Sequence, residues 1–166
     1  THGRYLVVFG GSTASTAESF DEAIATVGNR ILDRTFLPDV HPSIFDALAG
    51  KRANADGSLL IIETETACSI VRAVEAALKG TPVVLVELRL SDSGLSGKGM
   101  ALLSGTLHDV EAAAGLAAVG AGVHAAAPRG FSFRLIAAPH EVVEREIAAV
   151  TDFQNARMVD LDGESG

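Results

Sequence analysis

A short sequence pattern occurs twice in this chain, and the repeat limits the folds that the chain can adopt. Residues 4–10 and residues 99–105 are both apolar runs that end at a glycine, and a helical stretch follows each of them. Further along, a second apolar run leads in each copy to a histidine, His41 or His140, that opens a short helix. Because self-similarity of this kind is typical of a duplicated unit, we expect two copies of one fold.

The second copy also contains a strand–helix–strand segment for which the first copy shows no counterpart. Apolar runs rich in β-branched residues at 59–63 and 83–90 predict two strands. Between them, apolar residues recur at spacings of three and four over 67–79, after threonines that can cap a helix and before a glycine. The order over residues 58–137 is therefore strand–helix–strand–strand–helix–strand. This is the ferredoxin-like α+β arrangement, and one further helix follows it.

Residues 1–50 show only the second half of that order. Their predicted elements are a strand at 4–10, a helix at 14–27, a strand at 31–37 and a helix at 42–48. A half copy exposes a sheet edge and an apolar face, so we expect residues upstream of Thr1 in the native protein to cover them, or else another chain. The predicted divisions are a half copy at 1–50, a linker at 51–57, a complete copy at 58–150 and a frayed tail at 151–166.

Charge and composition exclude several classes of function. A net charge of −8 argues against a nucleic-acid-binding protein, which needs a basic face. The sequence contains no run of about 18 apolar residues, the length that a membrane-spanning helix requires. With 48% apolar and 20% charged residues, we expect the surplus apolar surface to be buried between subunits. The start of the chain has no charged-then-apolar leader, which favours a cytoplasmic protein.

Candidate chemical groups are few and scattered. Cys68 is the single cysteine, which excludes a disulfide framework within one chain, and we expect it to be a small buried residue rather than a reactive thiol. The five histidines lack the close spacing of a zinc site. We expect His41 and His140, at matching positions, to make the same structural hydrogen bond at a helix start. The glycine-rich turn at 10–13 precedes a helix, as a phosphate cradle does, but it lacks the known phosphate-binding patterns.

These observations predict no catalytic residues, no metal site and no cofactor, and they favour a protein whose function is assembly. A nucleotide-using enzyme built on the turn at 10–13 remains an alternative, and tight binding of ATP or phosphate would favour it. We interpret that turn as the end of a strand followed by a helix cap, because the matching turn at 105–106 in the second copy has this form.

Several short motifs occur in a fixed order over residues 58–148. They are LLIIET at 59–64, EAALK at 75–79, PVVLV at 82–86, SGL at 93–95, GKG at 97–99, GTLHDVEAA at 105–113 and Pro-His at 139–140. As a set, these motifs resemble the shell domain of bacterial microcompartments, the BMC domain. Residues 4–49 resemble the second half of the same domain. The chain is thus similar to the tandem-domain, trimer-forming (BMC-T) type of shell protein, with the first copy incomplete at its N-terminal side.

This resemblance implies a structural tile rather than an enzyme. Three chains would form a pseudohexameric disc with a central pore for small polar metabolites. The discs would meet other shell proteins edge to edge around encapsulated enzymes, as the shell of a microcompartment in the bacterial cytoplasm. Lys79 matches the lysine that lies at the tile edge in this family. The residues matched to the pore-lining loop are Ser91, Asp92, Ser93, Gly94, Leu95, Ser96 and Gly97, and His2 would face the same opening.

The resemblance does not carry a cofactor to this chain. Some members of the family bind an iron–sulfur cluster through a cysteine in the pore, but Cys68 lies in a predicted helix. A second alternative has the same fold and a different function: a ferredoxin-like oligomer that binds a regulatory small molecule between its copies. Discrete low oligomers and a melting temperature that depends on the ligand would favour this alternative.

Overall fold

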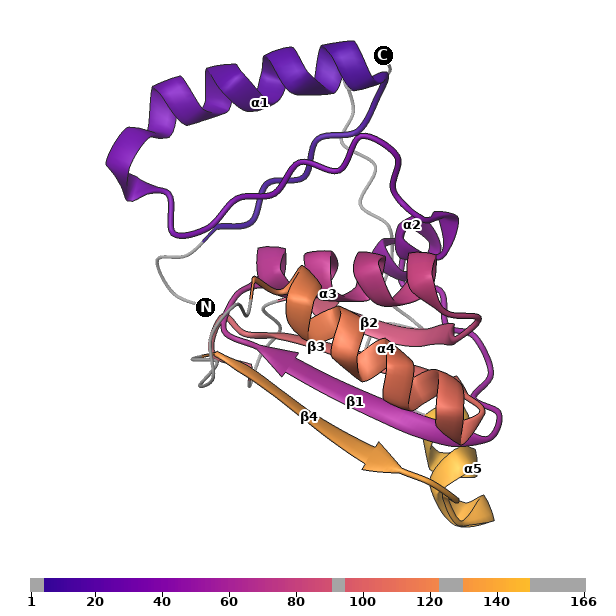
Figure 1. Cartoon of the computed structure of the whole chain (residues 1–166). Helices are drawn as coiled ribbons and strands as arrows, with labels where there is room; N and C mark the ends of the chain where they lie inside the picture. The colour runs from indigo at the N-terminus through magenta and orange to yellow at the C-terminus, as the bar shows by residue number, and fades with distance from the viewer. Residues whose placement is uncertain (1–4, 91–94, 123–129, 150–166) are drawn as a thin grey trace.

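A four-stranded antiparallel sheet forms the centre of the described part of this computed structural model, which comprises residues 5–90, 95–122 and 130–149. Its strands are β1 (Ser58–Thr64), β2 (Val84–Leu90), β3 (Gly99–Gly105) and β4 (Phe131–Ile136), in the spatial order β2-β3-β1-β4. Helices α3 (Ala67–Gly80) and α4 (Leu107–Gly120) cover one face of the sheet, and α5 (Glu141–Ala149) follows β4 (Figure 1). The predicted ferredoxin-like order with one appended helix is confirmed.

The central position of β1 follows from its sequence. β1 pairs with β3 on one side and with β4 on the other, so that Leu60 lies opposite both Leu103 and Leu135. A central strand that is covered on both faces needs apolar side chains in both directions. Accordingly, Leu60 and Ile62 are fully buried in the main core with the helices, and Leu59 is fully buried in a smaller cluster.

Helices α3 and α4 lie close to each other over the sheet. α3 begins with a capping box, in which the Ser69 amide donates to Thr66 Oγ1 at 3.0 Å and the Thr66 amide donates to Ser69 Oγ at 3.2 Å. Near the end of α4, a Cβ on Gly120 would lie 2.6 Å from the Cβ of Ala76 and 2.6 Å from the carbonyl oxygen of Arg72. The helices can approach this closely only because residue 120 has no side chain.

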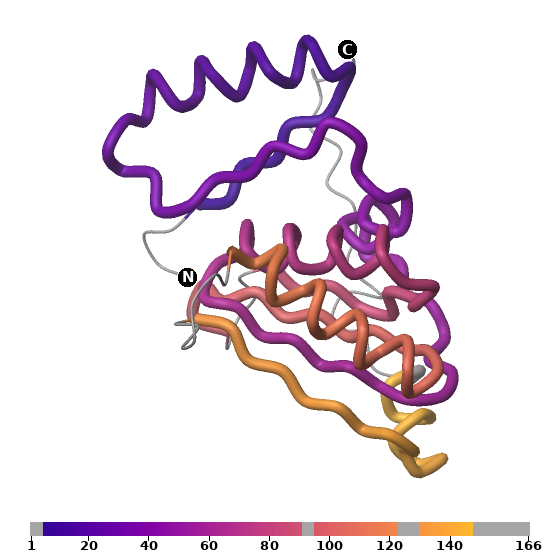
Figure 2. Tube along the Cα trace, viewed as in Figure 1, coloured from indigo at the N-terminus to yellow at the C-terminus, as the bar shows by residue number. Residues whose placement is uncertain are grey.

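The first part of the chain lies beside this domain. Helix α1 (Thr13–Val27) stands away from the sheet and leads through a short 3-10 helix (Gly28–Arg30) into residues 31–41, which run along α3 (Figures 1 and 2). Helix α2 (Pro42–Leu48) packs against β2 and α3, and its Ile44 is fully buried in the main core. The helices predicted at 14–27 and 42–48 are confirmed.

The strands predicted at 4–10 and 31–37 are wrong. Residues 5–10 and 31–37 belong to no β-ladder, and within the described ranges no backbone–backbone hydrogen bond joins either segment to a strand. A strand exists only where a neighbouring chain segment completes its ladder, and the described part of the chain places no such segment here. As a result, the large apolar side chains of residues 5–9 are exposed.

Candidate functional site

A carboxylate at the start of the second extended segment binds the N-terminal half of α3. Two nitrogens of Arg72 donate to the two carboxylate oxygens of Asp33, at 3.1 and 3.2 Å, and one of them also donates to the carbonyl oxygen of Arg34 at 3.0 Å. The hydroxyl of Thr66 donates to the same carboxylate. Burial raises the pKa of Asp33, but the hydrogen bonds from Arg72, Thr66 and the Arg34 amide outweigh burial, so this pKa lies below its ordinary value.

A second cluster joins the same segment to the C-terminal half of α3. The buried carboxylate of Glu75 accepts a hydrogen bond from the backbone N–H of His41 at 2.9 Å and pairs with Lys79 at 2.7 Å. Lys79 also donates to the carbonyl oxygen of Asp39. The bond to Glu75 raises the pKa of Lys79. Lys79, which we predicted at a tile edge, therefore makes contacts within the chain, while about half of its side chain stays exposed.

The sequence patterns do not mark Asp33, Arg72 or Glu75 as residues that join two segments of the chain. Arg72, Glu75 and Lys79 are spaced by three and four along α3, so they share one side of the helix, and this charged stripe was the available signal. Their partners lie in a segment more than thirty positions earlier in the chain, which no helical spacing connects to α3. Only the fold brings the two groups together.

The two repeated histidines make the predicted structural contact. Nδ1 of His41 accepts a hydrogen bond from the Ser43 amide at 3.3 Å, and Nδ1 of His140 accepts one from the Val142 amide at 3.2 Å. At both positions the histidine carbonyl also accepts from the amide three positions later. Both histidines thus cap a helix, and the matching geometry supports the equivalence of residues 31–48 and 130–147.

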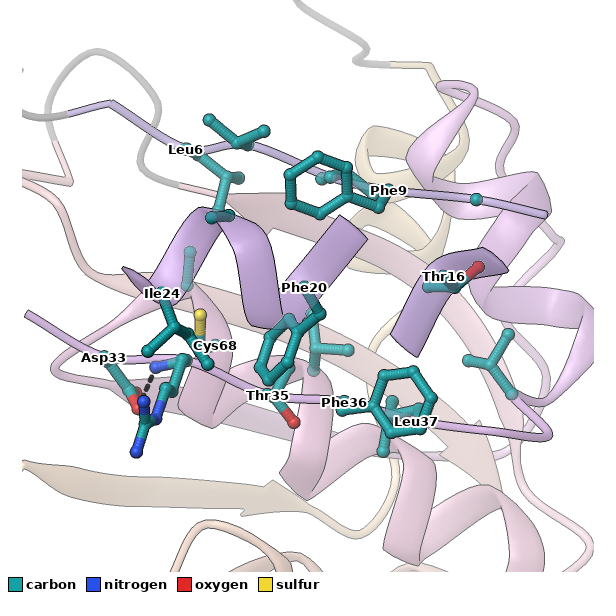
Figure 3. A pocket seen from close by; sticks show the side chains of 18 of the residues that line it. Leu6, Phe9, Thr16, Phe20, Ile24, Asp33, Thr35, Phe36, Leu37 and Cys68 are labelled. Carbon is teal, nitrogen blue, oxygen red and sulfur yellow. Dashed lines mark hydrogen bonds between the residues drawn. The ribbon is translucent and has the colours of Figure 1, made fainter. Parts of the chain in front are cut away.

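A cavity of about 900 Å³ lies between α1, the extended segment at 5–11 and the segment at 30–40. Figure 3 shows side chains that line it, among them Leu6 and Phe9 from the first segment and Ile24 from α1. Phe20 of α1 and Phe36 of the second segment also line it, and their ring centroids are 5.7 Å apart. Residues of α2, the first half of α3 and Leu90 complete the lining, and the wall is mostly apolar.

Cys68 lies on this cavity and is half-buried, whereas we predicted a small buried residue. Burial and the nearby charge of Asp33 raise the pKa of its thiol, against a smaller opposite effect of Arg72. A raised pKa disfavours the thiolate, which agrees with the prediction of an unreactive thiol. The turn at 10–13 is structural as predicted, because the Ser12 hydroxyl caps α1 by accepting from the Ser15 amide at 3.2 Å.

The predicted pore loop is described only in part. Leu95, Ser96 and Gly97 form a tight turn before β3, in which the Lys98 amide donates to the Leu95 carbonyl at 2.9 Å. Ser96 and Gly97 have positive φ angles of 53° and 88°. The other residues predicted at the pore lie outside the described residues; they are His2, Ser91, Asp92, Ser93 and Gly94.

Within residues 5–90, 95–122 and 130–149, no group of three or more histidine, cysteine, aspartate or glutamate side chains is arranged to hold a metal ion. In the same residues, no helix combines the length and the apolar character needed to cross a membrane.

Comparison with known proteins gives concordant results. The model of the BMC domain family matches residues 58–138. The bacterial microcompartment shell protein PduT of Citrobacter freundii is 26% identical over 121 residues, which are 72% of this chain and 65% of PduT. The crystal structure of a microcompartment protein from Desulfitobacterium hafniense DCB matches with a TM-score of 0.69 and 27% identity, over 81% of this chain and 73% of that one.

These matches differ in extent in an informative way. The two individual proteins match over more residues than the domain model does, and a match of 121 residues must include some that precede Ser58. The similarity therefore continues into the first part of the chain, although the chain spans only about 65% of the length of PduT. Residues 58–138 are thus similar to the BMC domain, and the longer similarities are to proteins of bacterial microcompartments, one of which is a shell protein.

Proposed function

We propose that this protein is a tile of a bacterial microcompartment shell rather than an enzyme. The observation that carries the proposal is the match of the BMC domain model to residues 58–138, together with a similarity to the shell protein PduT that reaches beyond those residues. In the described residues, the ion pair of Asp33 with Arg72 and the bond from the His41 amide to Glu75 hold residues 31–41 on α3. Such contacts serve assembly and rigidity rather than turnover.

Residues 1–50 are then the second half of a first BMC unit, joined by a linker at 51–57 to a second unit at 58–150. The order of extended segment, α1, extended segment and α2 repeats the order β3, α4, β4 and α5. The two histidine caps occupy the same place in both series. In this assignment, residues 5–10 correspond to β3 and residues 31–37 correspond to β4.

The contact between the two units supports a ring. It joins α2 and residues 31–41 of the first unit to α3 of the second, so it joins unlike surfaces and can repeat head to tail. The corresponding surface of the second unit is open: Val143, the counterpart of Ile44, is 40% exposed, whereas Ile44 is 1% exposed. We infer that α5 makes this contact with a neighbouring chain and that three chains close a pseudohexameric ring.

The pore and the tile edge are assigned within this ring. The loop that connects β2 to β3 in each unit surrounds the centre, and its glycines, serines and hydroxyls suit the passage of small polar metabolites. The pore residues are His2, Ser91, Asp92, Ser93, Gly94, Leu95, Ser96 and Gly97. Lys79 contacts neighbouring discs at the edge, through the half of its side chain that the bond to Glu75 leaves exposed. The shell would enclose enzymes in the bacterial cytoplasm.

The mass of the full-length protein in solution tests this function. Sedimentation equilibrium at micromolar concentration and moderate salt should give three chains per particle. A stable monomer over the whole concentration range would contradict the tile proposal, because an uncombined chain leaves the face around Val143 exposed to water.

The cavity of about 900 Å³ favours one second candidate, a regulatory oligomer that binds a small apolar molecule. Its volume is within the usual range of ligand pockets, about 300–1,000 Å³, and its wall is mostly apolar. Thermal unfolding in the presence of a panel of small apolar compounds separates the two functions. A rise in melting temperature that saturates with one compound, in a discrete low oligomer, would favour the regulatory function.

A further inference from the structure

A buried carboxylate connects two parts of the chain near the C-terminal end of α3. Glu75 is buried, and its two oxygens serve different partners. Oε2 accepts a hydrogen bond from the backbone N–H of His41 at 2.9 Å, and Oε1 lies 2.7 Å from Nζ of Lys79. His41 caps α2, which lies beside this end of α3 (Figure 1). One side chain therefore bridges the start of α2 and Lys79.

The burial of Oε1 keeps Lys79 in place. This oxygen is shielded from solvent, and in the described part of the chain the ammonium of Lys79 is the charged group that approaches it. If Lys79 turned away, a carboxylate oxygen would stay buried without a partner, and such a group is costly. We therefore expect the amine of Lys79 to stay beside Glu75 instead of sampling the many conformations of an exposed lysine.

A second contact of Lys79 comes from the first part of the chain. Its amine donates to the carbonyl oxygen of Asp39, and the carboxylate of Asp39 lies 4.0 Å away. A lysine ammonium has three N–H donors, of which Glu75 and the Asp39 carbonyl take two. About half of the Lys79 side chain is nevertheless exposed. The third donor is thus available to an acceptor outside the chain.

The pair of Lys98 with Glu63 provides an internal comparison. Lys98 is as exposed as Lys79, and its amine lies 2.7 Å from Glu63, the same distance as in the pair with Glu75. However, the Glu63 side chain is 42% exposed and that of Glu75 only 9%, so Glu63 keeps its water when its lysine moves away. The bond to Glu75 also raises the pKa of Lys79, which agrees with a firmly held amine.

We propose that Glu75 positions Lys79 for the contact between discs, and that it does so only while residues 39–41 lie on α3. This inference rests on the edge role of Lys79 in the proposed function. The contacts follow one another: α2 places the His41 amide, the amide fixes the carboxylate of Glu75, and the carboxylate fixes the amine of Lys79. Because a lysine that is already immobilised loses less rotamer entropy on binding, this arrangement strengthens the edge contact.

The formation of sheets by a Glu75→Gln variant tests the proposal. Glutamine keeps the shape of the side chain and an oxygen for the His41 amide, but it removes the charge that holds Lys79. We expect particles of unchanged mass that need a roughly tenfold higher protein concentration to form sheets, the effect of one hydrogen bond on an equilibrium. Glu63→Gln, which releases Lys98 instead, is the matched control and should assemble like the wild type.

A double variant separates a positioning role from a structural one. If Glu75 acts through Lys79, adding Glu75→Gln to Lys79→Ala should cause no further loss of sheets. A further loss in the double variant would overturn the proposal, because Glu75 would then act on assembly by a route that does not include Lys79.

Acylation of the lysine amines gives a readout that does not depend on assembly. A water-soluble succinimidyl ester reacts with unprotonated amines, and mass spectrometry of the peptides gives a rate for each lysine. In dilute wild-type protein, we expect Lys79 to react several-fold more slowly than Lys98, and Glu75→Gln to remove most of this difference. Equal rates at the two lysines of the wild type would overturn the proposal, even if the Glu75→Gln variant did not fold.

The Lys79→Ala variant distinguishes failure of the inference from failure of the proposed function. Impaired sheets from Lys79→Ala beside normal sheets from Glu75→Gln would retain the tile edge and refute only the positioning role of Glu75. Normal sheets from Lys79→Ala would refute the edge role itself, and the positioning role of Glu75 would be refuted with it.

Discussion

Replacing Arg72 with methionine tests the contact that fastens residues 31–41 to α3. The guanidinium makes two hydrogen bonds to Asp33 and one to the Arg34 carbonyl. Exposed ion pairs contribute about 0–1 kcal/mol, and removal of one partner from a buried pair costs about 3–5 kcal/mol. The two side chains retain 29% and 22% of their exposure, so the site lies between these limits. We expect Arg72→Met to lower the free energy of unfolding by about 2 kcal/mol.

Urea unfolding, combined with hydrogen exchange of residues 31–41, measures this loss. The Asp33→Asn variant and the double variant complete a mutant cycle, in which the coupling energy should be about 1–2 kcal/mol. Arg134→Met is the control, because the exposed Arg134 donates to the carbonyl of its own neighbour, Phe133. The control should change stability by less than about 0.5 kcal/mol. An Arg72→Met variant as stable as the control, or a coupling energy near zero, would refute the role given to this pair.

The same contact predicts a dependence on pH. The pKa of Asp33 is lower in the folded protein than its ordinary value of 3.8, so the unfolded chain binds the proton more tightly. The stabilisation by Asp33 is therefore fully present above about pH 4 and is lost as the pH falls through the folded pKa. The difference in stability between the wild type and Asp33→Asn should shrink over this acidic range. A difference that stays constant down to pH 2.5 would contradict the assignment.

Three further substitutions, two of them with a matched control, test the ring, the tile edge and the packing of α4 on α3. Val143→Asp should prevent the contact between chains, so that the sedimenting particle contains one chain instead of three. The helix content measured by circular dichroism should stay unchanged, and an intact trimer would count against the ring. Lys79→Ala should leave trimers intact but impair their assembly into sheets, whereas Lys98→Ala, equally exposed and also paired with a glutamate, should not. Gly120→Ala should destabilise the domain by about 1–3 kcal/mol because its Cβ meets α3. Gly115→Ala, where a Cβ meets open space, should stabilise it by about 0.5–1 kcal/mol in urea unfolding.

Local patterns in the sequence predicted the elements whose structure depends on their own residues. The helix at 42–48 has a histidine cap and a proline at its first position, and the structure begins and ends it at the predicted residues. The helix expected at 67–79 begins at the predicted residue and ends one residue later in the structure. The agreement is close because the caps and the apolar stripe of this helix are both encoded locally. The equivalence of the two histidine caps was also accessible, since it needs only the matching of two short segments.

Features that need a distant partner could not be predicted in the same way. The runs at 4–10 and 31–37 have the composition of strands, but a strand requires a paired neighbour, and none is present in the described residues. The bonds from Arg72 to Asp33 and from Glu75 to His41 depend on how two separate segments pack. The cavity is likewise a property of the gap between elements, which no local pattern encodes.

A protein that tiles a microcompartment shell should assemble into flat sheets. Electron microscopy of the protein, concentrated under conditions that preserve the trimer, makes such sheets visible. We expect flat discs with a six-fold outline and a central opening, packed edge to edge in extended sheets. Dispersed particles of one or two chains, without discs or sheets at any concentration, would contradict it.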